Sequence, residues 1–295
     1  MRWISRLIAA LLALIVAGCS SVQLAYNNAP FLLQYQLDRY LDLDDEQERV
    51  LRAQLVELQQ WHKSHALPLY AQTLRGWAQT LSRARTFTAQ EILDKQAVLQ
   101  DEALAFGQKA AQLLGPVIVT LGPTQRDRLA RRFETSNREY AQEFLNAPDQ
   151  GRSERRERFV KNYERWLGPL SEEQLTLLDQ WLDTHPNNPA LWAAERQARQ
   201  QALLNLIAEA PQFETPDEAS LALNDYLISL TSYQTPTIQA RQQERRIALA
   251  QLSAELLNIM TDTQRKHLQD ELLSYAADFE SLAGTTATSR KLSSP

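Results

Sequence analysis

The sequence has one cysteine and eight glycines among its 295 residues. A single cysteine, Cys19, excludes an intrachain disulfide and any metal site built from several thiolates. The few glycines form no phosphate-binding loop, and neither a nucleophile elbow nor a zinc-protease motif is present. Ala, Leu, Gln, Glu and Arg instead fill nearly every stretch between the prolines, and these residues favour helix. The sequence therefore predicts an all-α fold whose core is held by packing alone.

The chain is acidic, with 31 basic and 36 acidic residues and a formal net charge of −5. An excess of negative charge argues against nucleic acid as a partner. No arrangement of titratable residues indicates acid–base or nucleophilic chemistry, so we expect a protein that is not an enzyme and has no cofactor. His62 and His65 could share a metal only with a third ligand, and histidines at a helix end explain this pair better. We therefore predict no metal site.

Residues 1–18 have the pattern of a secretory signal. Arg2 and Arg6 precede a run of about ten apolar residues, Leu7 to Ala17, which is too short for a spanning helix of roughly 20 residues. The run ends in Val16-Ala17-Gly18-Cys19, which resembles the lipobox of bacterial lipoproteins. The resemblance implies that Cys19 is acylated, as with palmitate, and becomes the first residue of the mature chain.

The residue after the cysteine bears on location. Ser20, rather than Asp, resembles lipoproteins that are sent to the outer membrane. We therefore expect a protein held by its N-terminal lipid in the periplasmic leaflet of that membrane. Several acyl chains on one cysteine anchor a protein stably, whereas a single chain binds only marginally.

Four segments share one pattern: a large apolar residue, then an N-cap residue, then Gln three residues after the cap. This spacing predicts a capping box, in which the cap side chain accepts from the N3 amide and the Gln reaches back to the cap amide. Apolar residues at steps of three and four follow each Gln, as in an amphipathic helix. The cap and Gln pairs are Asp44 and Gln47, Gly122 and Gln125, Ser171 and Gln174, and Thr261 and Gln264.

The order of these four starts indicates an internal duplication. We expect an elongated multi-helix bundle of two tandem, related four-helix units, residues 42–147 and 169–283, with Pro68 opening a helix in the first unit.

The remaining segments lie outside the two units. A basic helix, 148–168, connects the units, and residues 284–295 have little apolar content and are expected to be unstructured. Residues 19–41 form a tether and a short aromatic helix. This helix has Arg39 as its one basic residue, so packing on the body is favoured over lying on the bilayer.

Two arginine-rich stretches alternate with acidic residues at helical spacing. Such a pattern usually forms a solvated face with weak ion pairs. The alternative is a surface that contacts an anionic partner, such as lipid headgroups or a cell-wall polymer. The arginines of this candidate surface are Arg126, Arg131, Arg132, Arg155, Arg156 and Arg158.

Several short motifs suggest a family. Tyr26-Asn27-Asn28, the segment 41–47, Trp61-His62 and the segment 166–174 resemble, with the lipobox, an uncharacterised family of proteobacterial envelope lipoproteins built around a domain of unknown function. The resemblance covers nearly the whole mature chain and implies no activity. The four caps are also similar to the Leu-Thr-x-x-Gln motifs of the Spy/CpxP group of periplasmic chaperones, although none has that motif in full.

These observations together favour a lipid-anchored, non-catalytic scaffold or binding module for an envelope protein or a cell-wall partner. A Spy-like chaperone or envelope-stress protein is the alternative. No pattern in the sequence indicates an oligomeric state.

The lipobox gives a direct prediction. Changing Cys19 to Ala removes the acylated thiol, so the protein should fold but stay unprocessed or lose its place in the outer membrane. Fractionation of cells and the mobility of the chain on a gel measure both effects. An unchanged amount of the Cys19→Ala variant in the outer-membrane fraction would contradict the anchor.

Overall fold

The computed structural model describes residues 21–83, 86–145, 148–231 and 236–292. These ranges are almost entirely helical and contain no strand, which confirms the predicted all-α fold. Residues 1–20, with the leader and Cys19, lie outside the described part of the chain. The α-helices are α2 (Ser21–Asn27), α3 (Ala29–Leu41), α4 (Asp45–Leu81), α5 (Ala89–Ile118), α6 (Pro123–Tyr140), α7 (Pro148–Leu167), α8 (Glu172–Thr184), α9 (Pro189–Glu209), α10 (Pro216–Ser229), α11 (Pro236–Asn258) and α12 (Asp262–Leu292), with a π-helical turn η1 (Ala141–Leu145) and a 3₁₀ turn η2 (Ala210–Gln212).

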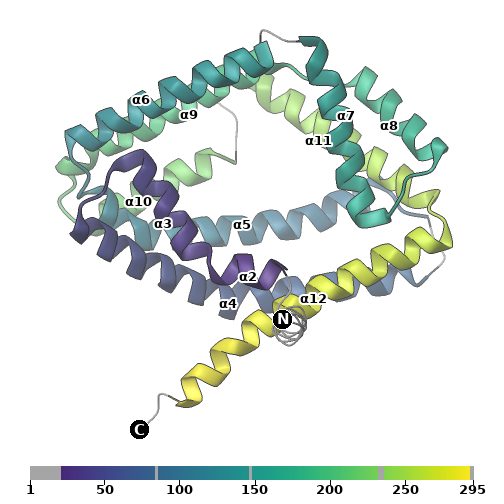
Figure 1. Ribbon diagram of the computed structural model, residues 1–295, viewed down its shortest axis with the longest axis horizontal. Coiled ribbons are helices and arrows are strands. Elements are labelled where there is room, and N and C mark those ends of the chain that lie inside the picture. Colours follow the sequence, from purple (N-terminus) through teal and green to yellow (C-terminus); the bar gives the residue numbers. More distant parts are fainter. Residues whose placement is uncertain (1–20, 84–85, 146–147, 232–235, 293–295) are drawn as a thin grey trace, which may run out of the picture.

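The helices are arranged along an elongated oval outline (Figure 1). The helices lie along the edge of this outline rather than around one central core.

The main helix pairs join the two predicted units. α4 packs along α12 at the lower edge of Figure 1, α6 packs against α9 at the upper edge, and α5 packs against α10 and α11. Each of these pairs takes one helix from residues 42–147 and another from beyond residue 169. The two units are thus intertwined, and an arrangement of two separate bundles in tandem is not confirmed.

Some contacts recur in the two halves of the chain. α3 contacts α4 and α6, just as α7 contacts α8 and α12. The short aromatic helix and the basic connecting helix of the sequence thus occupy comparable positions at the two ends of the molecule.

A pair of glutamines joins two helix starts at the end of the molecule formed by α3, α4 and α6. Gln47 and Gln125 each close a capping box with the backbone amide of Asp44 or Gly122. Their side chains also bond to each other: Gln125 Nε2 donates to Gln47 Oε1 at 2.6 Å, and Gln47 Nε2 donates to Gln125 Oε1 at 3.2 Å. The remaining N–H groups donate to the carbonyls of Thr120 and Asp42.

The same arrangement recurs at the opposite end. Gln174 and Gln264 cap the starts of α8 and α12, and Gln264 Nε2 donates to Gln174 Oε1 at 2.8 Å. Gln174 is fully buried, and its amide also donates to the carbonyl of Leu256. Because an amide both donates and accepts, each glutamine can satisfy a helix start and its partner at once. These two reciprocal pairs, which we call the glutamine joints, connect the N-termini of four helices.

Two boundaries differ from those expected from the sequence. Pro68 lies inside α4, which runs as one helix of 37 residues, rather than opening a new helix. The lost hydrogen bond to residue 64 is tolerated because α12 and other neighbours hold α4 on both sides of the proline. α12 continues to Leu292, although the sequence predicts loss of structure from residue 284. Extending an existing helix costs little, because its nucleus is already formed.

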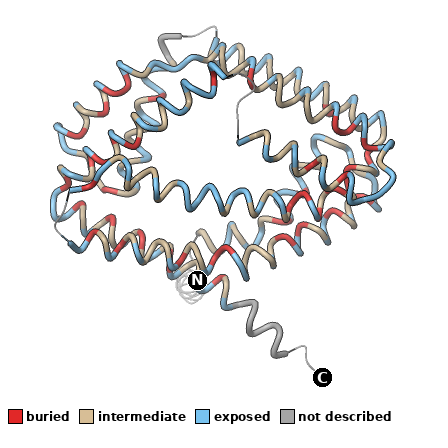
Figure 2. The backbone as a smooth tube through the Cα atoms, turned by 180° about the vertical axis from the view of Figure 1, so that it is seen from behind, coloured by how far each residue is buried: buried red, intermediate tan, exposed pale blue. Residues whose placement is uncertain are grey.

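Two larger groups of buried side chains lie toward opposite ends of the molecule. One core includes Leu178, Leu182 and Leu256 beside α7, α8 and α12, and the other includes Leu121, Leu129 and Leu223 beside α3, α6 and α10. A smaller group, Leu58, Ala110 and Leu113, belongs to α4 and α5, and further buried positions follow the edge of the molecule (Figure 2). α5 has no buried residue before Ala110. Each end thus has a core of its own beside a glutamine joint.

His62 takes part in a hydrogen bond between α2 and α4. The hydroxyl of Tyr26 on α2 and Nδ1 of His62 share a hydrogen bond of 2.7 Å, and the imidazole makes edge-type contacts with the rings of Tyr70 and Phe106. Burial lowers the pKa of His62, and burial together with Tyr70 raises the pKa of the Tyr26 hydroxyl. Burial thus favours the neutral forms of both groups in the bond that holds α2 against α4. His65 is exposed and stacks on Trp61.

Truncation of a glutamine joint should destabilise the protein strongly. Gln174→Ala leaves a buried amide and a backbone carbonyl without partners, so the free energy of unfolding should fall by about 2–4 kcal/mol. Gln60→Ala, at an exposed position of α4, should change it by less than about 0.5 kcal/mol. Urea unfolding measures both. The Gln174→Ala/Gln264→Ala double variant should lose less than the sum of the single losses, and strict additivity would contradict the pairing.

Acidification should weaken the contact between α2 and α4. The pKa of His62 is lower in the folded than in the unfolded chain, whose histidine titrates near 6.5. Its contribution to stability is therefore present above pH 6.5 and is lost as the pH falls through the folded pKa. Urea unfolding between pH 7.5 and 5 is measured for the wild type and for His62→Gln, whose glutamine can still hydrogen-bond to Tyr26 but does not titrate. The variant should lose less stability over this range, and identical slopes would exclude His62 as the cause.

Candidate functional site

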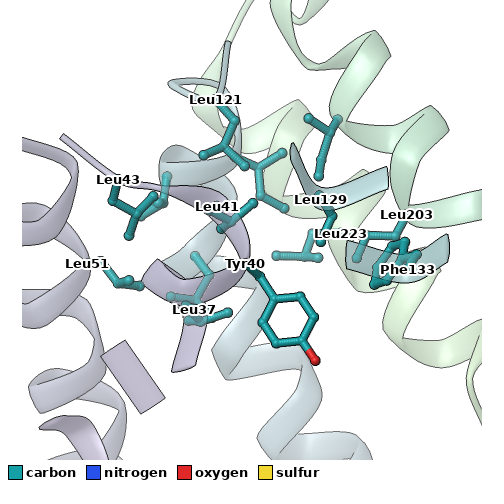
Figure 3. Close-up of a pocket in the computed structure, with 14 residues that line it drawn as sticks. Leu37, Tyr40, Leu41, Leu43, Leu51, Leu121, Leu129, Phe133, Leu203 and Leu223 are labelled. Carbon is teal, nitrogen blue, oxygen red and sulfur yellow. The ribbon is translucent and has the colours of Figure 1, made fainter. Parts of the chain in front are cut away.

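The most distinctive space in the structure is an apolar cavity of about 290 Å³ next to the first glutamine joint (Figure 3). It lies where α3, α4, α5, α6, α9 and α10 meet. Leucines from all six of these helices and from the turns between them make up most of its wall. The lining residues are Leu37, Tyr40, Leu41, Leu43, Leu51, Leu114, Val117, Ile118, Leu121, Leu129, Phe133, Leu203, Ile207 and Leu223.

The cavity wall exposes no polar atom to the space. Tyr40 is the single lining residue with a polar group, and Figure 3 shows its hydroxyl pointing away from the other labelled side chains. Tyr40 is 38% exposed and thus lies at the rim. An engineered apolar cavity of about 150 Å³ stays dry and binds benzene, and ligand sites begin near 300 Å³. The space is suited to a purely apolar guest.

The two ends of the molecule are filled differently. At the opposite end, α7 contributes Phe159, Tyr163 and Trp166 to the side chains that pack on the core. At this end α3 contributes Leu37, Leu41 and Tyr40, and Tyr40 lies at the rim. Two leucines inside fill less space than three aromatic rings, and a space remains under α3.

One wall of the cavity is fixed by a close helix crossing. A Cβ atom on Gly115 of α5 would lie 2.6 Å from the Cα of Ser220 on α10. Only glycine allows this approach, because the obstacle is backbone and cannot rotate away. The crossing holds Leu114 and Val117 of α5 opposite Leu223 of α10, so this side of the cavity cannot collapse without separating the two helices.

α3 has two apolar faces. Leu37, Tyr40 and Leu41 line the cavity, whereas four large side chains near the start of the helix are largely open to solvent. The exposed fractions are 64% for Phe31, 50% for Leu32, 49% for Leu33 and 54% for Tyr35. A monomeric protein rarely leaves so many neighbouring apolar groups uncovered without a partner. The helix therefore connects the cavity with an exposed apolar surface.

The candidate anionic-partner arginines lie in different environments. Arg131, Arg132 and Arg158 are exposed, and Arg126 lies 3.7 Å from Asp127. Arg156 is paired with Asp179, where its Nε donates at 2.7 Å. Arg155 is buried rather than on a surface, because it stacks on Phe159 and Trp181. One continuous surface formed by all six is therefore not present.

Within the described ranges, no group of three or more His, Cys, Asp or Glu side chains is placed to hold a metal ion. No helix in that part of the chain is both long enough and apolar enough to cross a membrane.

Sequence reasoning missed the cavity. Its lining leucines have ordinary helical spacing, and this pattern predicts a filled core. A usable signal is the contrast between the two halves, since α7 has Phe159, Tyr163 and Trp166 where α3 has smaller or more polar residues. That contrast becomes informative only once α3 and α7 are known to occupy comparable positions.

Comparison with known proteins adds a family but no activity. No curated protein and no solved structure matches the chain. No match extends the resemblance to envelope lipoproteins or to Spy/CpxP chaperones, which stay predictions. The model of a family of unknown function (DUF6279) matches residues 39–229, about two thirds of the chain and the part that contains every cavity-lining residue except Leu37, and the chain therefore belongs to this family.

Proposed function

We propose that this protein is a lipid-anchored, non-catalytic binding module at the periplasmic face of the outer membrane, and that the cavity under α3 takes one acyl chain. The observation that carries the proposal is a 290 Å³ space without polar lining, next to a helix with exposed apolar side chains. A catalytic site would need polar groups converging on a reacting atom, and this cavity has none.

The lining selects a hydrocarbon rather than a polar small molecule. A polar group inside would lose its hydrogen bonds to water and find no partner in the wall. Each buried methylene contributes about 0.8 kcal/mol. The polar end of such a guest would stay at the rim near Tyr40, the one residue there with a hydroxyl.

The position of α3, close to Cys19 in the sequence, supports the bilayer as the source of the acyl chain. Nine residues separate Cys19 from Ala29, and seven of them form α2, Ser21–Asn27. With helical and extended rises per residue, the start of α3 is at most about 25 Å from Cys19. A lipid on Cys19 would thus hold the exposed side chains of α3 close to the bilayer, where acyl chains are available.

The purified protein should bind decanoate with a Kd of order 10 µM, measured by calorimetry. Butyrate, which lacks six methylenes, should give no measurable binding at the same concentrations. Leu203→Trp puts a large ring into the cavity and should abolish binding. Ala208→Trp, at an exposed position of the same helix, should bind as the wild type does. Equal binding of both acids, or unchanged binding by Leu203→Trp, would exclude the cavity as an acyl site.

A further inference from the structure

Arg155 of α7 is a charged side chain that is buried at the end of the molecule opposite the cavity. It is 5% exposed, and its Nε and Nη2 are buried without a hydrogen-bond partner. Its guanidinium carbon lies 5.2 Å from the ring centre of Trp181 on α8 and 5.5 Å from that of Phe159. The aromatic contacts explain its packing, but they leave two strong donors unsatisfied.

The unused atoms form the edge of the guanidinium that binds carboxylates elsewhere in this chain. Arg156 donates through Nε and Nη2 to Asp179, and Arg75 does the same to Glu280. Arg152 also uses both atoms, on Asp183. This edge matches the two oxygens of a carboxylate. In Arg155 the same edge is buried and has no acceptor.

A second buried donor lies beside it. The indole Nε1 of Trp181 also lacks a partner, and Trp181 is 7% exposed. Arg245 of α11 contacts the same ring, with its guanidinium carbon 5.9 Å from the ring centre. Arg155 of α7 and Arg245 of α11 thus both contact the indole ring of Trp181 on α8, and the N–H of that ring has no partner.

The local charge is positive. Burial, followed by the neighbouring charges of Arg245, Arg152 and Arg158, lowers the pKa of Arg155 to about 10. These neighbouring charges are all cations, so an anion placed here would relieve both the repulsion and the unsatisfied donors.

Open space adjoins the cluster. Trp181 lines a hollow of about 250 Å³, and Arg245 lines one of about 610 Å³. Each hollow has one carboxylate among its lining residues, Glu255 in the first and Glu244 in the second. Thr184 and His185 line both hollows. A small molecule therefore has room beside the ring that the arginines contact.

We propose that Arg155, Trp181 and Arg245 form a binding site for a carboxylate group. The carboxylate accepts from Nε and Nη2 of Arg155, the indole N–H of Trp181 donates to the same ligand, and Arg245 neutralises its charge. The site lies at the end of the molecule opposite the acyl cavity and does not depend on the function proposed for that cavity.

The probes are sodium benzoate and its neutral isostere benzamide, titrated into the purified full chain at constant ionic strength. Benzoate should bind and shift the Trp181 indole N–H resonance, whereas benzamide should bind at least about tenfold more weakly, because it lacks the charge. Equal binding of the two would overturn the proposal. Tighter binding of inorganic phosphate than of benzoate would overturn the assignment to a carboxylate.

Variants separate the site from non-specific anion binding. Arg155→Met keeps the apolar stem and should weaken benzoate at least about tenfold, whereas Lys161→Met, at an exposed position of the same helix, should leave it unchanged. Trp181→Phe keeps a ring, removes the N–H and should weaken benzoate severalfold. If Arg155→Met does not fold, Arg155→Lys, which loses the two-point edge, supplies the same comparison. Wild-type affinity in Arg155→Met or Arg155→Lys would exclude Arg155 as the binding residue.

Discussion

The capacity of one amide side chain to donate and accept at the same time is the constraint on which this fold depends. A helix start leaves backbone N–H groups unsatisfied, and two such starts meet at each end of the molecule. A glutamine at each start satisfies its own cap and still has a donor and an acceptor for the other glutamine. A glutamate in this position would place a carboxylate oxygen, which only accepts, against the amide oxygen of the other glutamine. It would also bury a negative charge there. The low dielectric around Gln174 strengthens the bonds and makes their loss costly.

The two joints connect a chain whose halves are intertwined. Contacts such as those of α4 with α12 join segments that are far apart in sequence. Folding must close these long loops before most of the core can form, which slows folding relative to a bundle with local contacts. α3 and α7 occupy comparable positions at the two ends, and three aromatic side chains of α7 fill one end, whereas Leu37 and Leu41 of α3 leave a space at the other.

Local chemistry made much of the fold predictable from the sequence. The caps at Asp44 and Ser171 depend on residues three positions apart, so the helix starts could be recognised without tertiary knowledge. The pairing of Gln47 with Gln125 could not, because nothing local indicates which starts meet. Pro68 shows the opposite case, in which packing along α12 overrides a local signal. The candidate sites could not be predicted for a related reason. The burial of Arg155 and the space under α3 depend on side chains from other helices, and the sequence of one segment does not show which helices pack against it.

The hydrogen bond from Gln23 of α2 to Asp278 of α12, at 2.8 Å, brings the beginning and the end of the described chain together. Figure 1 shows α2 beside α12 on one side of the oval. Attachment of the N-terminal end to any surface therefore positions the later part of α12 at that surface as well. The turn between α8 and α9 lies on the opposite side, so a label or a fused domain inserted there would point away from such a surface.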